Sequence, residues 1–430
     1  MVHDHTVVIR GGRIVDATGE RMADVLVERG AIAAVEPSID PPAGATVLDA
    51  GGCIVGPGLV DLHTHLRQPG REEAETVESG ARAAALGGFT AVVAMPNTEP
   101  AIDTASAVRE VLELGVTVAC DVRVAGAITK GRKGRELAPL GEMADLGVRL
   151  FTDDGAGVQD ARLMRRALEY ASALSVILGQ HCEDDELALG GHMHEGEWSS
   201  RLGIPGQPHE AEELMVARDI SLVRLTGGRV HFLHLSTAGS VAAVRAAKAE
   251  GLPVTAEAAP HHFTLTDASV ASYDTVFKVN PPLRTPADVE AVKAGLADGT
   301  IDAIATDHAP HAAEDKDVPF DQAKPGMLGL ETALALAVTE LELPIAQVLA
   351  LLSWNPARIA GLESTHGGPV VAGRPANLCV VDPAATWLVD ADALASRSRN
   401  TPYAGRKLTG RVRHTMLRGE PVVVDGSAQR

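Results

Sequence analysis

Apolar runs of strand length alternate with alanine-rich segments through the middle of the chain. The alanine-rich segments, such as 78–86 and 160–174, favour helices, and apolar runs bounded by turns favour buried strands. Eight such runs lie at residues 58–63, 89–95, 116–124, 148–152, 175–181, 229–235, 254–259 and 301–306. Eight strand-then-helix units predict a (β/α)8 barrel. A doubly wound open sheet is the alternative, but no GxGxxG motif stands at a strand-to-helix turn.

The two ends of the chain have a different texture, with short strand-like stretches between glycine turns. These stretches are 6–10, 25–28 and 31–35 at one end, and 377–382 and 411–417 at the other. Barrel termini lie close in space, so we expect both ends to pack together. The predicted α/β fold is a barrel at 57–365 beside a small β-sandwich domain built from 1–56 and 366–430.

Composition excludes several classes of function. With 430 residues, 45% hydrophobic and 22% charged, the chain is globular and long enough for two units. An aromatic content of 3% and a net charge of −19 argue against a nucleic-acid partner. The stretch Met1–His5 lacks the basic start of a signal peptide, and no uncharged apolar stretch is long enough to span a membrane. We therefore expect a cytoplasmic protein without a membrane partner, whose single cysteines, Cys182 included, are buried thiols.

Residues able to bind metal stand at the ends of five of the eight apolar runs. They include His63 and His65, Asp153 and Asp154, His181, His234, and Asp307 with His308 and His311. The C-terminal ends of barrel strands meet at the face where barrel enzymes place their sites. In the stretch DLHTHLRQPG (61–70), His63, His65 and Arg67 are two residues apart, so on a strand they would share one side. We therefore expect these side chains to converge on one pocket.

Imidazole and carboxylate together favour zinc or a similar divalent ion, because calcium prefers oxygen ligands alone. Clustered thiols are absent from the sequence, which favours a catalytic site with an open position over a closed structural one. Four histidines and two carboxylates exceed what one tetrahedral ion needs. The pattern leaves open whether one ion or two are bound.

Seven motifs spread over nearly the whole chain resemble the amidohydrolase superfamily, and within it the longer bacterial dihydroorotases. They are DLHTHLRQPG (61–70), GGFTAVVAMPNTEP (87–100), LFTDDG (150–155), HFLHLST (231–237), AEAAPHHFTLTD (256–267), KVNPPLR (278–284) and ATDHAPH (305–311). The resemblance implies a zinc-dependent barrel enzyme that interconverts carbamoyl-aspartate and dihydroorotate in pyrimidine synthesis. It implies the zinc ligands His63, His65, Asp154, His181, His234 and Asp307, with Asp307 also the catalytic proton carrier.

The resemblance also implies substrate-binding residues. Arg67 would hold the substrate carboxylate, Asn97 and Asn280 would orient the ring, and His311 would be a further donor to the carboxylate. The segment 311–329 is expected to close over the substrate, with backbone contacts near Pro325 and Gly326. Here Lys324-Pro325 departs from the usual residues before that glycine. A turn before Pro281 is the alternative role for Asn280, and His308 is expected to point away from the site.

The sequence leaves two alternative functions open. Allantoinases and dihydropyrimidinases open similar rings, but they usually bridge their metals with a carbamylated lysine after the fourth strand. This chain has no lysine between Lys133 and Lys248, so Asp154, or its neighbour Asp153, would take that place. The second reading is an inactive scaffold for aspartate transcarbamoylase, although such relatives typically lose ligands that are present here. A homodimer, and possible association with that transcarbamoylase, are further expectations.

Overall fold

The computed structural model describes residues 6–430, so the stretch 1–5 discussed above lies outside the described residues. Two parallel sheets, ordered β10-β9-β8 and β11-β12-β15-β16-β17, form the centre of the larger unit. Their strands are β8 (Leu59–Thr64), β9 (Phe89–Ala94), β10 (Asp121–Val124), β11 (Leu150–Thr152), β12 (Ile177–Gln180), β15 (Val230–Phe232), β16 (Val254–Ala258) and β17 (Ala303–Ile304). Isolated parallel bridges from Gly126 to Phe151 and from Thr64 to His308 join the two sheets at both edges. The sheets therefore close, and the barrel prediction is confirmed over the open sheet.

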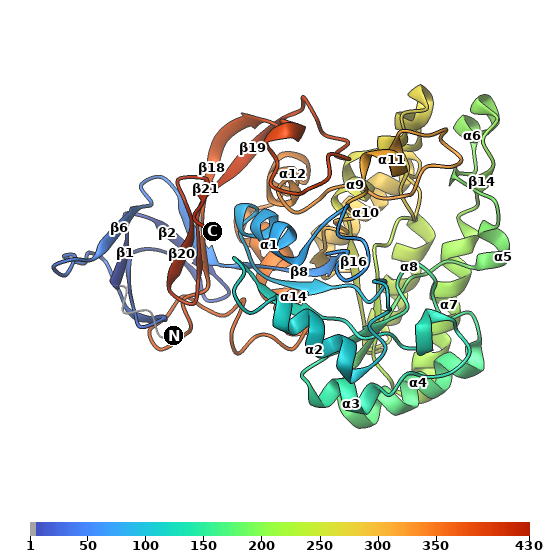
Figure 1. The fold of residues 1–430 in the computed structure, drawn as a ribbon, viewed down its shortest axis with the longest axis horizontal. Coiled ribbons are helices and arrows are strands. Elements are labelled where there is room, and N and C mark those ends of the chain that lie inside the picture. Colours follow the sequence, from blue (N-terminus) through green and yellow to red (C-terminus); the bar gives the residue numbers. More distant parts are fainter. Residues whose placement is uncertain (1–5) are drawn as a thin grey trace.

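Helices follow the strands and cover the outside of the barrel (Figure 1). The main ones are α1 (Val77–Leu86), α2 (Ala105–Leu114), α3 (Leu140–Asp145), α4 (Ala161–Leu174), α7 (Glu210–Thr226), α8 (Ala238–Ala249), α10 (Pro286–Asp298) and α12 (Ala333–Glu340). Several begin at the residue that the sequence favours as a cap. The Asp160 side chain accepts from the amides of Arg162 and Leu163, and Thr237 accepts from Ser240. No helix within residues 6–430 is long and apolar enough to cross a membrane.

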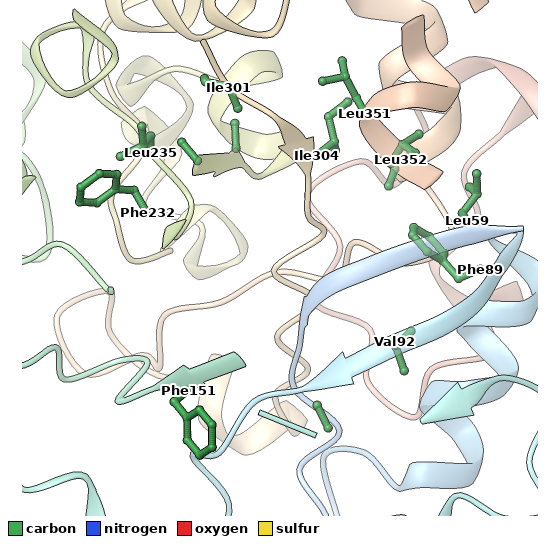
Figure 2. Packing of buried hydrophobic residues seen from close by; sticks show 14 of the residues in the cluster. Leu59, Phe89, Val92, Phe151, Phe232, Leu235, Ile301, Ile304, Leu351 and Leu352 are labelled. Atoms are coloured by element: carbon green, nitrogen blue, oxygen red, sulfur yellow. The ribbon is translucent and has the colours of Figure 1, made fainter. Parts of the chain in front are cut away.

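Alternate positions along the strands supply two different layers of the core. On β9, Val92 and Ala94 belong to the large cluster that packs against the helices, whereas Val93 belongs to a separate cluster with Leu62 and Ala303 from other strands. Figure 2 shows members of the large cluster, among them Phe89, between the strands and the surrounding helices. This period of two is what a strand buried on both faces requires.

One predicted strand is partly wrong. The run 116–124 forms a strand only from Asp121 onward, and Val116 is 68% exposed. The apolar residues before Asp121 belong to the turn and bends that follow α2. Apolar character alone therefore misplaced the start of this strand.

Strands from both chain ends form the second unit. A seven-stranded sheet, β21-β20-β19-β18-β7-β2-β3, combines N-terminal and C-terminal strands, and a four-stranded sheet, β5-β4-β1-β6, packs beside it (Figure 1). The strands are β1 (Thr6–Arg10), β2 (Arg13–Asp16), β3 (Gly19–Met22), β4 (Asp24–Glu28), β5 (Ala31–Glu36), β6 (Thr46–Asp49), β7 (Ile54–Pro57), β18 (Leu378–Leu388), β19 (Lys407–Leu417), β20 (Glu420–Val424) and β21 (Ser427–Ala428). Their shared core includes Val7, Val25 and Val380. The expected sandwich of both ends is confirmed as part of the fold.

Candidate metal centre

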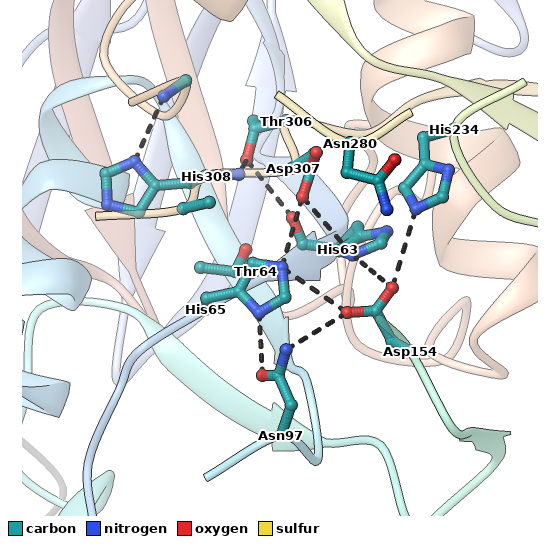
Figure 3. Close-up of polar contacts among 12 residues, drawn as sticks. His63, Thr64, His65, Asn97, Asp154, His234, Asn280, Thr306, Asp307 and His308 are labelled. Carbon is teal, nitrogen blue, oxygen red and sulfur yellow. Dashed lines mark hydrogen bonds and ion pairs between the residues drawn. The ribbon is translucent and has the colours of Figure 1, made fainter. Parts of the chain in front are cut away.

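Six side chains converge at the C-terminal ends of the barrel strands, and Figure 3 labels all of them except His181. They are His63 in β8, His65 after it, Asp154 after β11, His181 after β12, His234 after β15 and Asp307 after β17. Each is at most 5% exposed. Ligand atoms lie within 4.8 Å of one another in two groups of three, His63/His65/Asp307 and His63/Asp154/His234. The structure thus brings together all six residues expected to hold metal.

Asp154 occupies the centre of this cluster. Its Oδ1 lies 3.3 Å from His63 Nε2, 3.5 Å from His181 Nδ1 and 3.6 Å from His234 Nε2. The second carboxylate, Asp307, places Oδ1 3.2 Å from His65 Nε2 and 3.5 Å from His63 Nε2. His63 Nε2 therefore faces both carboxylates.

The charges in the cluster favour a cation. Burial raises the pKa of Asp154, but the charge of His63 and the hydrogen bonds of His181 and His234 outweigh it, and its pKa lies well below the usual range. Burial also raises the pKa of Asp307, but the hydrogen bond from His65 and the charge of His63 outweigh it, so the pKa of Asp307 is lowered. Both carboxylates are therefore ionised at neutral pH and able to bind a metal.

The donor set fits a divalent metal ion. His63 Nδ1 donates to Glu257 Oε1 at 2.9 Å, so Nε2 is the nitrogen that faces the two aspartates and becomes a ligand once a metal displaces its proton. That Nε2 is buried and has no hydrogen-bond partner among the described residues. Imidazole nitrogens of this kind with carboxylates are the ligands of zinc and similar ions.

Three site residues have backbone conformations that an ordinary strand does not provide. Arg67, His234 and Asp307 have φ values of 60°, 29° and 45°, in the left-handed region. Strand β8 ends at Thr64, so the expectation that Arg67 continues the strand alternation of His63 and His65 is wrong. Its side chain still approaches the site, because the chain turns there.

Arg67 lies buried without an acidic partner. Its Nε donates to the Pro310 carbonyl at 3.0 Å, its Nη2 lies 3.4 Å from His311 Nε2, and among the described residues no carboxylate pairs with it. Burial and the charge of Arg71 lower its pKa to about 10, so the guanidinium stays charged at neutral pH. A buried cation without a counterion favours binding of an anionic ligand.

Asn280 and Asn97, the other expected substrate residues beside the cluster, differ in how many of their polar atoms already have hydrogen-bond partners. Asn280 Nδ2 lies 3.4 Å from His181 Nε2, while its buried Oδ1 has no partner among the described residues. Both ends of Asn97 are engaged: Oδ1 accepts from His65 Nδ1 at 2.9 Å, and Nδ2 donates to Asp154 Oδ2 at 3.3 Å. In this structure Asn97 therefore orients two cluster residues.

The segment after β17 is tied down by its own hydrogen bonds. His311 Nε2 donates to the Pro325 carbonyl at 2.8 Å, and the Gly326 amide donates to the Lys278 carbonyl at 2.9 Å. Burial and the charge of Arg67 lower the pKa of His311 to about 2, so His311 is neutral and has no second N–H to donate. In this conformation it does not present the carboxylate donor that the resemblance implies.

The sequence of this chain is similar to those of known dihydroorotases over nearly its whole length. A family model described as Dihydro-orotase-like matches residues 52–240. A dihydroorotase from Pelotomaculum thermopropionicum is 50% identical over 424 residues, which cover 97% of this chain and 98% of the relative. A dihydroorotase from Streptomyces coelicolor is 51% identical over 426 residues, with 97% and 98% covered. The chain belongs to the dihydroorotase family.

Solved structures of cyclic amidases share the fold of this dihydroorotase-family chain. An L-hydantoinase (dihydropyrimidinase) from Arthrobacter aurescens superposes with a TM-score of 0.89 at 26% identity, covering 99% of this chain and 98% of that one. A dihydropyrimidinase from Brevibacillus agri gives 0.87 at 22% identity, with 99% and 96% covered. At the lower identity the likeness concerns the fold alone.

Sequence reasoning missed several buried residues that hold this dihydroorotase-family site together. Asp61 accepts from the Thr306 amide at 2.8 Å and from its hydroxyl at 2.6 Å, which ties β8 to the segment before Asp307. Glu257 accepts from His63, and His261 Nε2 lies 3.7 Å from Asp307 Oδ2. A charged residue inside an apolar strand run is the signal that would have found Asp61 and Glu257. His308 points away, as expected, toward Glu75 and the Gly329 amide (Figure 3).

Asp154→Ala is expected to lower metal occupancy, whereas Asp153→Ala is expected to lower it much less. The Asp153 carboxylate points away from the cluster, where it accepts from the amides of Ile128 and Thr129 at 2.9 and 3.0 Å. Metal analysis of both purified variants tests the assignment. Equal loss of metal from the two variants would contradict it.

Proposed function

We propose that this chain is a zinc-dependent dihydroorotase that reversibly converts N-carbamoyl-L-aspartate into (S)-dihydroorotate in pyrimidine synthesis. The observation that carries the proposal is the unpaired, buried guanidinium of Arg67 beside a cluster of four histidines and two aspartates. Both compounds carry a carboxylate, and Arg67 keeps Nη1 and Nη2 for a forked contact with it. A neutral ring would form no ion pair with that buried guanidinium.

The chain's own residues account for the remaining chemistry. A bound divalent ion would polarise the scissile carbonyl and lower the pKa of the attacking water. Asp307, ionised and facing the cluster, takes a proton from that water and passes it to the leaving ring nitrogen. The free Oδ1 of Asn280 is an acceptor for a ring N–H.

His311, Pro325 and Gly326 are proposed to act after a rearrangement. For His311 to donate to the substrate carboxylate, the hydrogen bond from its Nε2 to the Pro325 carbonyl must first break. His311 also lines a cavity of about 580 Å³ with Lys316 and Asn400, which gives the segment room to move. We also propose that Asn97 contacts the substrate amide when His65 and Asp154 bind a metal instead of Asn97.

Two alternatives make different predictions. A hydantoinase or allantoinase would hydrolyse neutral rings, and the hydantoinase likeness is one of fold at 26% identity or less in the two structures above. An inactive scaffold would have no reason to keep all six cluster residues in contact. The proposal extends to a cytoplasmic homodimer with possible binding to aspartate transcarbamoylase, which sedimentation with and without that enzyme would test.

Removing metal is the direct test of the proposal. The purified chain is expected to contain zinc, to lose turnover of dihydroorotate when treated with a chelator, and to recover it when zinc is returned. A neutral dihydropyrimidine ring should be a much poorer substrate. Protein that holds no transition metal and shows no turnover after zinc is added would overturn the proposal.

A further inference from the structure

A chain of buried hydrogen bonds runs from His63 into the barrel interior. Glu257 Oε1 accepts from His63 Nδ1 at 2.9 Å, and Oε2 accepts from His231 Nε2 at 2.9 Å. The far nitrogen of His231, Nδ1, lies 2.8 Å from the Thr255 hydroxyl. His63, His231 and Glu257 are each 0% exposed. The three side chains therefore depend on one another for their hydrogen bonds.

The strand register explains how these residues meet. His231 on β15 pairs with Thr255 on β16, and Glu257 lies two residues further along β16, on the same side of that strand. Glu257 itself pairs with Ala303 on β17, and β17 is followed in the barrel by β8, which carries His63. The carboxylate thus bridges from the sixth strand to the first through the interior.

The contacts with Glu257 fix one proton on each of the two histidines. Carboxylate oxygens accept only, so both ring nitrogens that face Glu257 carry protons. His63 then has its proton on Nδ1 and keeps the lone pair of Nε2 for the cluster, while the Thr255 hydroxyl donates to His231 Nδ1. The alternative tautomer of His63 would leave its Nδ1 lone pair against a carboxylate and put a proton where a metal must bind.

We infer that Glu257, braced by His231 and Thr255, is a positioning residue that fixes the tautomer and orientation of His63 for metal binding. The inference rests on the metal site of the proposed function, and it is independent of which substrate is bound. Partners of this kind behind a metal-binding histidine typically change metal affinity about 10- to 100-fold when they are removed.

Glu257→Leu and Glu257→Gln separate the two contributions. Leu removes the acceptor and lets His63 take the wrong tautomer, so we expect metal affinity to fall about 100-fold. Gln keeps an acceptor for His63, provided that the His231 proton moves to Nδ1 and the Thr255 hydroxyl becomes its acceptor. We therefore expect a loss near 10-fold for Gln, and a larger loss in Glu257→Gln with Thr255→Val than the two single changes predict.

Asp121→Asn is the matched control. Asp121 is also a buried carboxylate that accepts from a histidine, His366 Nε2 at 2.9 Å, but it lies at the start of β10, at the opposite end of the barrel from the cluster. It should cost stability without changing metal affinity.

The measurement is the zinc dissociation constant of full-length metal-free protein, by competition with a chelator, together with ring ¹⁵N spectra that report the His63 tautomer. Folding of each variant is checked by circular dichroism. Affinity within about threefold of wild type in a folded Glu257→Leu protein would overturn the inference. If that variant does not fold, ring ¹⁵N spectra of zinc-loaded wild type decide the question: His63 bound to zinc through Nδ1 would overturn the inference, and His63 bound through Nε2 with its proton on Nδ1 supports it. Wild type that binds zinc but does not turn over dihydroorotate would instead count against the proposed function alone.

Discussion

Asp307→Asn is expected to lower turnover about 10²- to 10⁴-fold, the usual contribution of general acid–base catalysis. The carboxylate of Asp307 lies 3.2 Å from His65 Nε2, and its lowered pKa keeps it free to accept a proton at neutral pH. An amide oxygen can still approach a metal but cannot take up a proton. Metal content should therefore fall only partly while turnover falls steeply, measured at saturating zinc.

Asp154→Asn is the control for Asp307→Asn, because Asp154 also faces His63 and His65 but is not assigned the proton transfer. At saturating zinc it should retain more turnover than Asp307→Asn. An Asp307→Asn enzyme with full metal and more than about a tenth of wild-type activity would leave Asp307 a ligand only. His311 would then be the next residue to test as the proton carrier.

The parts of the site that the sequence predicted are those that depend on strand position alone. A histidine or aspartate at the end of a buried strand must lie on the catalytic face once the strands close into a barrel, so His181 and Asp307 could be placed from the pattern. The same logic explains the failure at 116–124, where apolar residues stand in a turn rather than in a strand. Periodicity records burial, and burial does not require pairing with another strand.

What the sequence could not give are contacts that exist only after closure. Asp61 and Thr306 are 245 residues apart, and their hydrogen bonds form because β8 and the segment after β17 become neighbours. The pairing of Glu257 with His63 has the same origin. The approach of Arg67 depends on a left-handed backbone at a residue beyond the strand end, which no alternation rule predicts.

Arg67→Met is expected to reduce kcat/KM for dihydroorotate by at least roughly 10- to 150-fold, because a hydrogen bond to a charged group contributes about 1.5–3 kcal/mol. Metal content should stay at the wild-type level, since Arg67 is not placed as a ligand. The free protein should be as stable as wild type or more so, because the variant removes a buried guanidinium without an acidic partner.

Arg71→Met is the control: it lies in the same loop and pairs with Asp315 at 2.7 Å instead of facing the cluster, so it should keep most activity. Steady-state kinetics and thermal unfolding of both variants test this, alongside hydrolysis of a neutral dihydropyrimidine ring. The loss in Arg67→Met should be confined to the substrate with a carboxylate. A variant with wild-type KM and turnover on dihydroorotate would show that the buried charge of Arg67 serves the fold, and the carboxylate would have to be bound by another cation.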